Sequence, residues 1–333
     1  MAILRDLTPG VYWCDSTGSN WKELTLEGIE NNVDNVIENI KRIGISTGYN
    51  DDSERISFSV KIPTEELVEE EYNSNKNYGT FHQWHFFLAY KDIINALTDK
   101  RGGYRFRETI WTRTVYNEGN EGENNGIQWG IDLAYESSIV LWKSGKAYGI
   151  PVTIEDGVSN DSKSSYTYAE VENRAGIYYT ANKPNMHETY YPLKYEYGND
   201  SVTDKWITVS TRQKGERISF FFKPKKREYY NGVQTDDSRL LSKYQWEFLF
   251  AYKDLLDEFY RQLNSNKKPG ELDPYCLPGL FLTSTQYNGK PNSIATNENK
   301  SDGVGISWAV TPSFAGSLIV IRDGLETNFL YKE

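Results

Sequence analysis

Cysteine is scarce in this sequence. The 333 residues include only Cys14 and Cys276, and these two do not occupy equivalent places in the two halves of the chain. A disulfide framework needs paired cysteines at regular spacings. We therefore expect two isolated thiols and synthesis in a reducing cytoplasm.

Long apolar runs are missing as well. No window approaches the roughly 18 apolar residues of a membrane span, and the start of the chain, up to Gly10, lacks the apolar stretch of a signal peptide. We expect a protein that is soluble as made and has no membrane span. Only 38% of the residues are apolar, but 14% are aromatic, and these large rings can build a packed core.

Positive charge is in short supply. The formal net charge is −10, and the densest basic run is Lys223–Arg227. A protein that binds nucleic acid without sequence preference needs a basic surface to neutralise phosphates. The composition therefore argues against specific nucleic-acid binding.

Catalytic motifs are absent. The sequence has no nucleophile elbow, phosphate-binding loop, zinc-protease motif or dinucleotide fingerprint. His82 and His85 are too few for a metal site, which needs three or four ligands. The Asn73–Gly79 segment lacks the acidic first ligand and closing Glu of a calcium loop. No carboxylate pair stands out among 47 acidic residues, so we expect no catalytic residue, no cofactor and no metal.

A long internal repeat is present. Thr80–Asp92 returns as Ser242–Asp254, and Glu54–Phe58 returns as Glu216–Phe220, both at an offset of 162 residues. Two matches at one offset predict a tandem duplication. In later parts of the copies the offset grows to 171 and then 179, as expected when loops lengthen at little entropic cost.

Each copy of the repeat carries a helix-start signal. Thr80 with Gln83, and Ser242 with Gln245, have the spacing of a capping box. Apolar residues then recur at intervals of three and four, and Gly or Pro-Gly ends each segment. The pattern predicts one amphipathic helix per copy, over residues 80–99 in the first. A further helix is predicted from Ile29 to Ile43.

Strands surround these helices. After each helix further strands are predicted: Thr109–Tyr116, Gly126–Trp129 and Ser138–Trp142 in the first copy, and Phe281–Tyr287, Gly305–Trp308 and Ser317–Ile321 in the second. Between Arg55 and Lys61 apolar and polar residues alternate, which places Phe58 and Val60 on one face of a strand. The predicted class is α+β: two tandem copies of a β-rich domain, each an antiparallel sheet with one amphipathic helix. The first copy with its N-terminal arm spans residues 1–151, a linker spans 152–175, and the second copy spans 176–333.

Both copies keep the sequence Ala-Tyr-Lys-Asp within the helix. The favoured interpretation of Lys91 and Asp92, and of their counterparts Lys253 and Asp254, is an exposed and weak ion pair. The alternative is a buried polar contact that fixes the helix on its sheet.

Several aromatic residues lie outside the strongest repeat signal. Tyr and Trp are enriched at protein interfaces and can also stack on sugar rings. Core packing is the default for any one of them, but 25 tyrosines make some exposed rings expected. The candidate interface residues are Trp13, Trp21, Tyr190, Tyr191, Tyr229 and Tyr230.

The segment Leu7-Thr-Pro-Gly-Val-Tyr-Trp13 is similar to the opening of some tail proteins of tailed bacteriophages. The bias toward Asn, Lys, Glu and Tyr resembles virion proteins of crAss-like phages of gut bacteria. This resemblance implies a non-enzymatic structural component of a virion, made in the host cytoplasm. It implies a homo-oligomeric ring or adaptor in the tail, collar or head–tail connection that contacts other virion proteins, with an acidic conduit along which DNA slides.

Two other functions stay open. A carbohydrate-binding adhesin or tail-fibre module would use exposed Trp and Tyr side chains. A glycan-cleaving enzyme would need a pair of carboxylates at catalytic separation.

Overall fold

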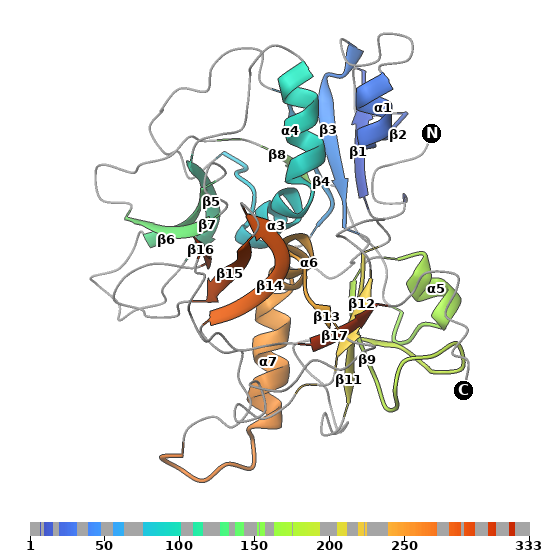
Figure 1. Cartoon of the computed structure of the whole chain (residues 1–333), viewed down its shortest axis with the longest axis vertical. Helices are drawn as coiled ribbons and strands as arrows, with labels where there is room; N and C mark the ends of the chain where they lie inside the picture. The colour runs from blue at the N-terminus through green and yellow to red at the C-terminus, as the bar shows by residue number, and fades with distance from the viewer. Residues whose placement is uncertain are drawn as a thin grey trace. The chain divides into compact units, whose positions relative to one another are not determined.

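The computed structural model of the chain divides into two compact units (Figure 1). Unit 1 comprises Met1–Asp161 with Asn297–Trp308, and unit 2 comprises Ser162–Thr296 with Ala309–Glu333. The structure describes residues 7, 10–15, 20–31, 39–47, 56–62, 76–100, 109–115, 127–132, 137–142, 152, 154–156, 163–174, 176–193, 205–211, 219–222, 224, 239–271, 280–287, 290–296, 306–310 and 320–323.

Unit 1 is built on a five-stranded sheet of order β2-β1-β3-β4-β8. All of its strand pairs are antiparallel, and Val11 pairs with Ile45 while Ile45 pairs with Phe58. Every residue of β1 is buried, so both faces of this strand are covered. The strands are β1 (Gly10–Cys14), β2 (Lys22–Glu23), β3 (Arg42–Ser46), β4 (Phe58–Lys61) and β8 (Ile154–Asp156).

The helix predicted from Ile29 to Ile43 is wrong at its C-terminal end. Helix α1 spans Leu26–Asn31, whereas Arg42 and Ile43 begin β3. Residues 32–38 lie outside the described part of the chain. The helical spacing of the isoleucines is overridden because Ile43 pairs with Trp13 on one side and Val60 on the other, a context in which β-branched residues pack well.

The predicted capping box of the first copy is confirmed. The Thr80 hydroxyl accepts from the Gln83 amide at 3.1 Å, and the Gln83 side chain accepts from the Thr80 amide at 2.8 Å. The helix that follows differs from the single amphipathic helix predicted. It is two helices, α3 (Phe81–Ala89) and α4 (Lys91–Lys100), and every residue of α3 is buried.

The helix breaks at Tyr90. Its amide bonds to the Phe87 carbonyl, three residues back, at 3.1 Å, which tightens the last turn of α3. The Tyr90 carbonyl then accepts from Ile94 at 3.1 Å and starts α4. Because all sides of α3 meet protein, its apolar residues follow no single stripe; only α4 has the predicted amphipathic character.

Unit 1 also contains a second antiparallel sheet of order β5-β6-β7, as the strand patterns after the helix predicted. Helix α3 contacts β5 and β6, and the Phe81 amide donates to the Thr114 hydroxyl at 2.9 Å. The strands are β5 (Thr109–Val115), β6 (Ile127–Asp132) and β7 (Ser137–Trp142).

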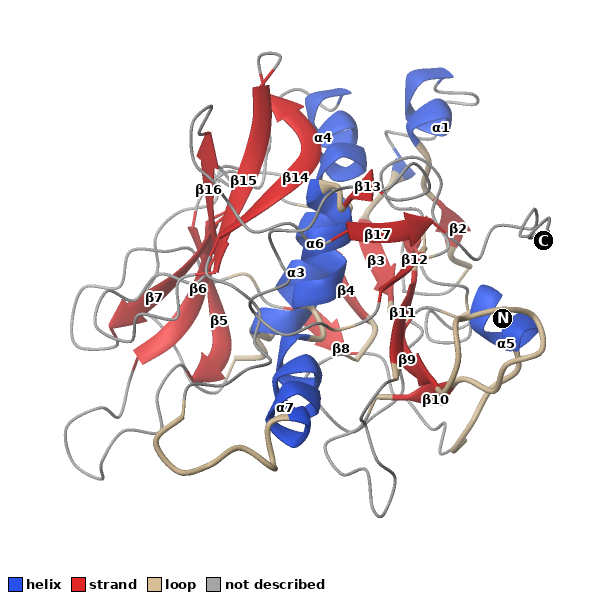
Figure 2. Cartoon of the chain, turned by 60° about the horizontal axis from the view of Figure 1, so that its bottom comes forward, coloured by secondary structure: helices blue, strands red, loops and turns tan. Residues whose placement is uncertain are grey.

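Unit 2 is built on a sheet of order β10-β9-β11-β12-β17-β13. Neighbouring strands in this order are paired antiparallel, and they are drawn as red arrows in Figure 2. The strands are β9 (Gly176–Thr180), β10 (Tyr191–Pro192), β11 (Trp206–Ser210), β12 (Phe220–Phe222), β13 (Arg239–Leu240) and β17 (Val320–Asp323).

The second repeated helix begins at the predicted capping box and is also broken. Ser242 and Gln245 exchange hydrogen bonds of 3.2 and 2.9 Å. Helix α6 (Lys243–Phe250) is followed by α7 (Lys253–Leu263). The remaining strands are β14 (Leu280–Tyr287) and β15 (Lys290–Thr296), which pair antiparallel with a register shift, and β16 (Ile306–Val310).

The segment predicted as a linker, residues 152–175, contains regular structure. Strand β8 pairs with β4 in unit 1, and the short helix α5 (Tyr168–Glu172) belongs to unit 2. Sheets and helices in separate segments of the chain make the fold α+β, as predicted.

Candidate functional site

Three of the predicted interface aromatics are core residues. Trp13 and Trp21 are 7% and 9% exposed, and Tyr190 is completely buried. These rings fill the interior next to their sheets and offer little or no surface to a partner, which corrects the prediction for them. Tyr229 and Tyr230 lie outside the described residues.

Tyr191 is the one predicted residue, among those described, that reaches solvent, at 36% exposure. It lies on β10, the edge strand of its sheet, directly opposite Tyr179 of β9. The two rings are stacked, with centroids 5.2 Å apart and planes 22° apart. A ring supported in this way from one side can receive a sugar ring or a partner's apolar side chain on another.

The matching position in unit 1 is occupied differently. Lys22 of edge strand β2 lies opposite Trp13 of β1, and its Nζ sits 4.8 Å from the centroid of the Trp13 ring. A cation–π contact of this kind places a charged group at the edge of the sheet. The two units therefore present different chemistry at corresponding edges, a lysine in unit 1 and a tyrosine in unit 2.

Met186 was not predicted and is the most exposed large apolar side chain of the described residues, at 58%. It lies in the connection between β9 and β10, on the same hairpin as Tyr191. Besides Met186 and Tyr191, the one exposed large apolar side chain in the described part of the chain is Leu26, at 39%. The turn residues of Lys183-Pro-Asn-Met could have indicated a hairpin tip, but not its exposure.

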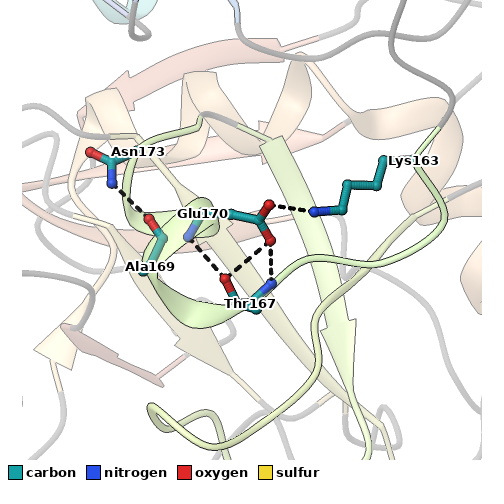
Figure 3. A network of polar contacts seen from close by, with 5 residues as sticks. All are labelled: Lys163, Thr167, Ala169, Glu170 and Asn173. Atoms are coloured by element: carbon teal, nitrogen blue, oxygen red, sulfur yellow. Dashed lines mark hydrogen bonds and ion pairs between the residues drawn. The ribbon is translucent and has the colours of Figure 1, made fainter.

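A polar network surrounds the start of α5 (Figure 3). The Thr167 amide and hydroxyl donate to the Glu170 carboxylate at 2.8 and 3.0 Å, and the Glu170 amide donates to the Thr167 hydroxyl at 3.4 Å. Lys163 forms an ion pair with the same carboxylate. The Asn173 side chain donates to the Ala169 carbonyl at 2.7 Å. Thr167 and Glu170 cap the N-terminus of α5, and Asn173 is its C-cap residue.

The hydrogen bond from Lys163, followed by that from the Thr167 amide, lowers the pKa of Glu170 to about 2. A carboxyl group with so low a pKa holds no proton near neutral pH, so it is unsuited to act as a general acid. Glu170 instead serves as the N3 residue of the capping box at the start of α5.

This network predicts a stability difference that depends on pH. Because the folded pKa of Glu170 is lowered from 4.5 to about 2, its contribution is present above about pH 5 and is lost as the pH falls toward about 2. Lys163 and Glu170 are 46% and 42% exposed, so solvent screening limits the contribution to about 1 kcal/mol or less. Thermal unfolding of wild type and Glu170→Gln should differ near neutral pH and converge in acid.

Glutamine at this position keeps the hydrogen-bonding geometry of the cap, so the comparison isolates the charge. Lys163→Gln serves as the matched control and should reproduce most of the loss, because Lys163 is the largest cause of the lowered pKa. A difference of equal size at both ends of the pH range would contradict the prediction.

The two histidines of α3 pack against an aromatic ring. The Phe81 ring centroid is 5.3 Å from that of His82 and 4.3 Å from that of His85, both edge-on. The described residues contain no group of three or more His, Cys, Asp or Glu side chains placed to hold a metal ion. Both histidines are buried, and their rings pack against Phe81.

The favoured interpretation of Lys91 as an exposed residue is wrong. Lys91 is only 8% exposed, whereas Asp92 is partly buried and accepts from the Ile93 amide at 2.8 Å. The side chain of Lys253 lies outside the described residues. Lys91 is buried because the first turn of α4 follows directly from the enclosed helix α3.

No protein-family model, curated protein or solved structure matches this chain. In the described segments, no helix combines the length and the apolar character that crossing a membrane requires.

Proposed function

We propose that this chain is a non-enzymatic structural component of a bacteriophage virion. It forms a ring or adaptor, in the tail or in the head–tail connection, by self-assembly and by contact with other virion proteins. The similarity of the Leu7–Trp13 segment to phage tail proteins and the bias in composition support this origin. The net charge of −10 suits a conduit that DNA passes without binding.

The proposal includes a tandem duplication of one β-rich domain. The sheet register supports it, because β1 pairs with β3 from Gly10↔Ser46 onward and β9 pairs with β11 from Gly176↔Ser210 onward in the same pattern. Hydrogen bonds recur at matching places as well. The Ser46 hydroxyl donates to the Leu7 carbonyl at 2.9 Å, and the Ser210 hydroxyl donates to the Val171 carbonyl at 2.8 Å.

One observation carries the proposal: the two units match in sheet register, but their edge strands β2 and β10 carry different residues at corresponding positions. Two like units in one chain provide related but non-identical surfaces, and a contact between different surfaces of successive copies is heterologous. Heterologous contacts generate closed rings when the rotation between copies allows closure. The difference between the Lys22 edge and the Tyr191 edge supplies such unlike surfaces.

Light scattering of the purified chain over a range of concentrations tests the proposal. The expected result is a closed oligomer of defined mass, or a mass that rises with concentration. A strict monomer at every concentration would contradict self-assembly.

A second candidate function is carbohydrate binding by an adhesin or tail-fibre module. The observation that favours it is the exposed ring of Tyr191, which Tyr179 supports from one side. Binding of bacterial surface polysaccharide by the wild type, lost in Tyr191→Ala and kept in Tyr191→Phe, would support this function. Equal binding by all three proteins would exclude a role for this ring.

A further inference from the structure

The chain leaves helix α7 through a loop that is exposed throughout. Asn264, the C-cap residue of α7, is 8% exposed, whereas all seven residues from Ser265 to Glu271 are exposed. In Figure 1 this loop is the orange tube below α7. Exposed loop tips with small or polar residues are the preferred sites of proteolytic cleavage.

Two tight turns shape the loop, and one peptide bond joins them. The Lys267 amide donates to the Asn264 carbonyl at 3.0 Å, which closes the first turn. The Glu271 amide donates to the Lys268 carbonyl at 3.1 Å, which closes the second. The Lys267–Lys268 bond therefore lies between two local turns and outside any helix or strand.

The second turn contains a proline directly after Lys268. Pro269 and Gly270, which has a φ of +85°, occupy the two central positions of a type II turn. Proline has no amide hydrogen, and its ring crowds the preceding peptide bond. The Lys268–Pro269 bond is therefore a poor substrate for a protease, which leaves the carboxyl side of Lys267 as the point of cleavage.

Arg261 is a basic residue in the opposite situation, six residues earlier. Its side chain is 70% exposed, but it lies within α7 and donates two hydrogen bonds of 2.6 Å to the Glu258 carboxylate. Leu256 and Phe259 of the same helix are completely buried. Cleavage in a packed helix requires the helix to unfold locally, whereas a surface loop opens at little cost.

We propose that the Lys267–Lys268 bond is a cleavage site for trypsin-like serine proteases, and that the cleaved chain stays assembled. These proteases select their substrates through a specificity pocket, which in trypsin is acidic and matches the exposed Lys267 side chain. Water adds across the bond. Its oxygen joins the Lys267 carbonyl carbon as the bond to the Lys268 nitrogen breaks, which leaves a carboxylate on Lys267 and an ammonium group on Lys268.

The two pieces stay together because a strand from the C-terminal piece lies inside the sheet of unit 2. Strand β17 follows the cut in sequence, and it pairs with β12 on one side and β13 on the other, both of which precede the cut. The Ser284 amide also donates to the Leu241 carbonyl at 2.9 Å, and the Lys243 amide donates to the Thr285 hydroxyl at 2.9 Å. Loss of the C-terminal piece would break these bonds and expose two strand edges.

Brief digestion of the native full chain with trypsin tests the cleavage site. The expected product is a fragment whose N-terminal sequence is Lys268-Pro-Gly-Glu, and this fragment should be lost in Lys267→Gln. Arg261→Gln is the matched control and should leave the fragment unchanged. A wild-type digest without this fragment, or cleavage after Arg261 as fast as after Lys267, would overturn the site.

Size-exclusion chromatography of the same digest tests whether the pieces stay together. The fragments from the two sides of the cut should elute together in buffer and separate in urea. Separation in buffer would overturn the claim that β17 holds the cleaved chain together. Neither readout depends on the proposed self-assembly, so the light-scattering result and this one can fail independently.

Discussion

Trp246→Ala should lower the free energy of unfolding by about 3 to 5 kcal/mol, the usual cost of truncating a buried tryptophan. The Trp246 side chain is completely buried, and its ring stacks on Phe250 with centroids 5.6 Å apart. Trp246 is the fourth residue after the N-cap Ser242. Leu241, the residue just before the cap, is also completely buried. This is the arrangement of a hydrophobic staple, which fixes how the chain enters the helix.

Urea unfolding followed by circular dichroism measures this loss. Trp246→Phe is the matched control, because it keeps an aromatic ring in the core and should cost clearly less. Trp84→Ala should have a comparable effect in unit 1, where the buried Trp84 ring contacts Phe58 and Phe87 edge-on with centroids 6.0 and 5.1 Å apart. A loss below about 1 kcal/mol, typical of surface positions, would show that these rings do not anchor the helices.

Gly79→Ala should destabilise the protein by about 1 to 3 kcal/mol, as overpacking of a filled core does. A Cβ atom at this position would lie 2.5 Å from Nε1 and 2.8 Å from Cε2 of Trp84. The indole cannot move away cheaply, because Trp84 is completely buried. The repeat places Leu241 at the corresponding position of unit 2, so the two units pack their helix starts in different ways.

The matched control for this substitution is Gly28→Ala. Gly28 lies within α1, where the nearest atom to an added Cβ would be the Thr25 hydroxyl at 3.1 Å. Alanine is favoured over glycine in a helix by up to about 1 kcal/mol, so the change should be small or stabilising. Equal losses in both variants would mean that glycine's backbone freedom, and not the Trp84 ring, explains the effect at position 79.

Local chemistry made several features predictable from the sequence. Thr80 with Gln83, and Ser242 with Gln245, form the predicted capping boxes, because a cap needs only residues three apart and a chain that turns between them. The strands after each helix were also predictable, since alternation and β-branched residues are local patterns. These signals were sufficient for the α+β class.

The candidate site was much less predictable. Tyr190 and Tyr191 are adjacent in sequence, yet one is completely buried and the other is 36% exposed. Successive residues of a strand point to opposite faces, but which face is covered depends on residues distant in the chain. Met186 gave no signal of its own, because the exposure of one side chain at a hairpin tip follows from how the whole loop folds.

The sequence by itself determined where the repeated helices begin, that strands follow each of them, and that the chain is acidic. Only the tertiary structure decided that the helix breaks at Tyr90, that α3 and Lys91 are buried, and that Tyr191 reaches solvent. The physical reason is the distance along the sequence between the residues that interact. Caps and alternating patterns are set by neighbours a few residues apart, whereas burial is the sum of contacts with segments far away in the sequence.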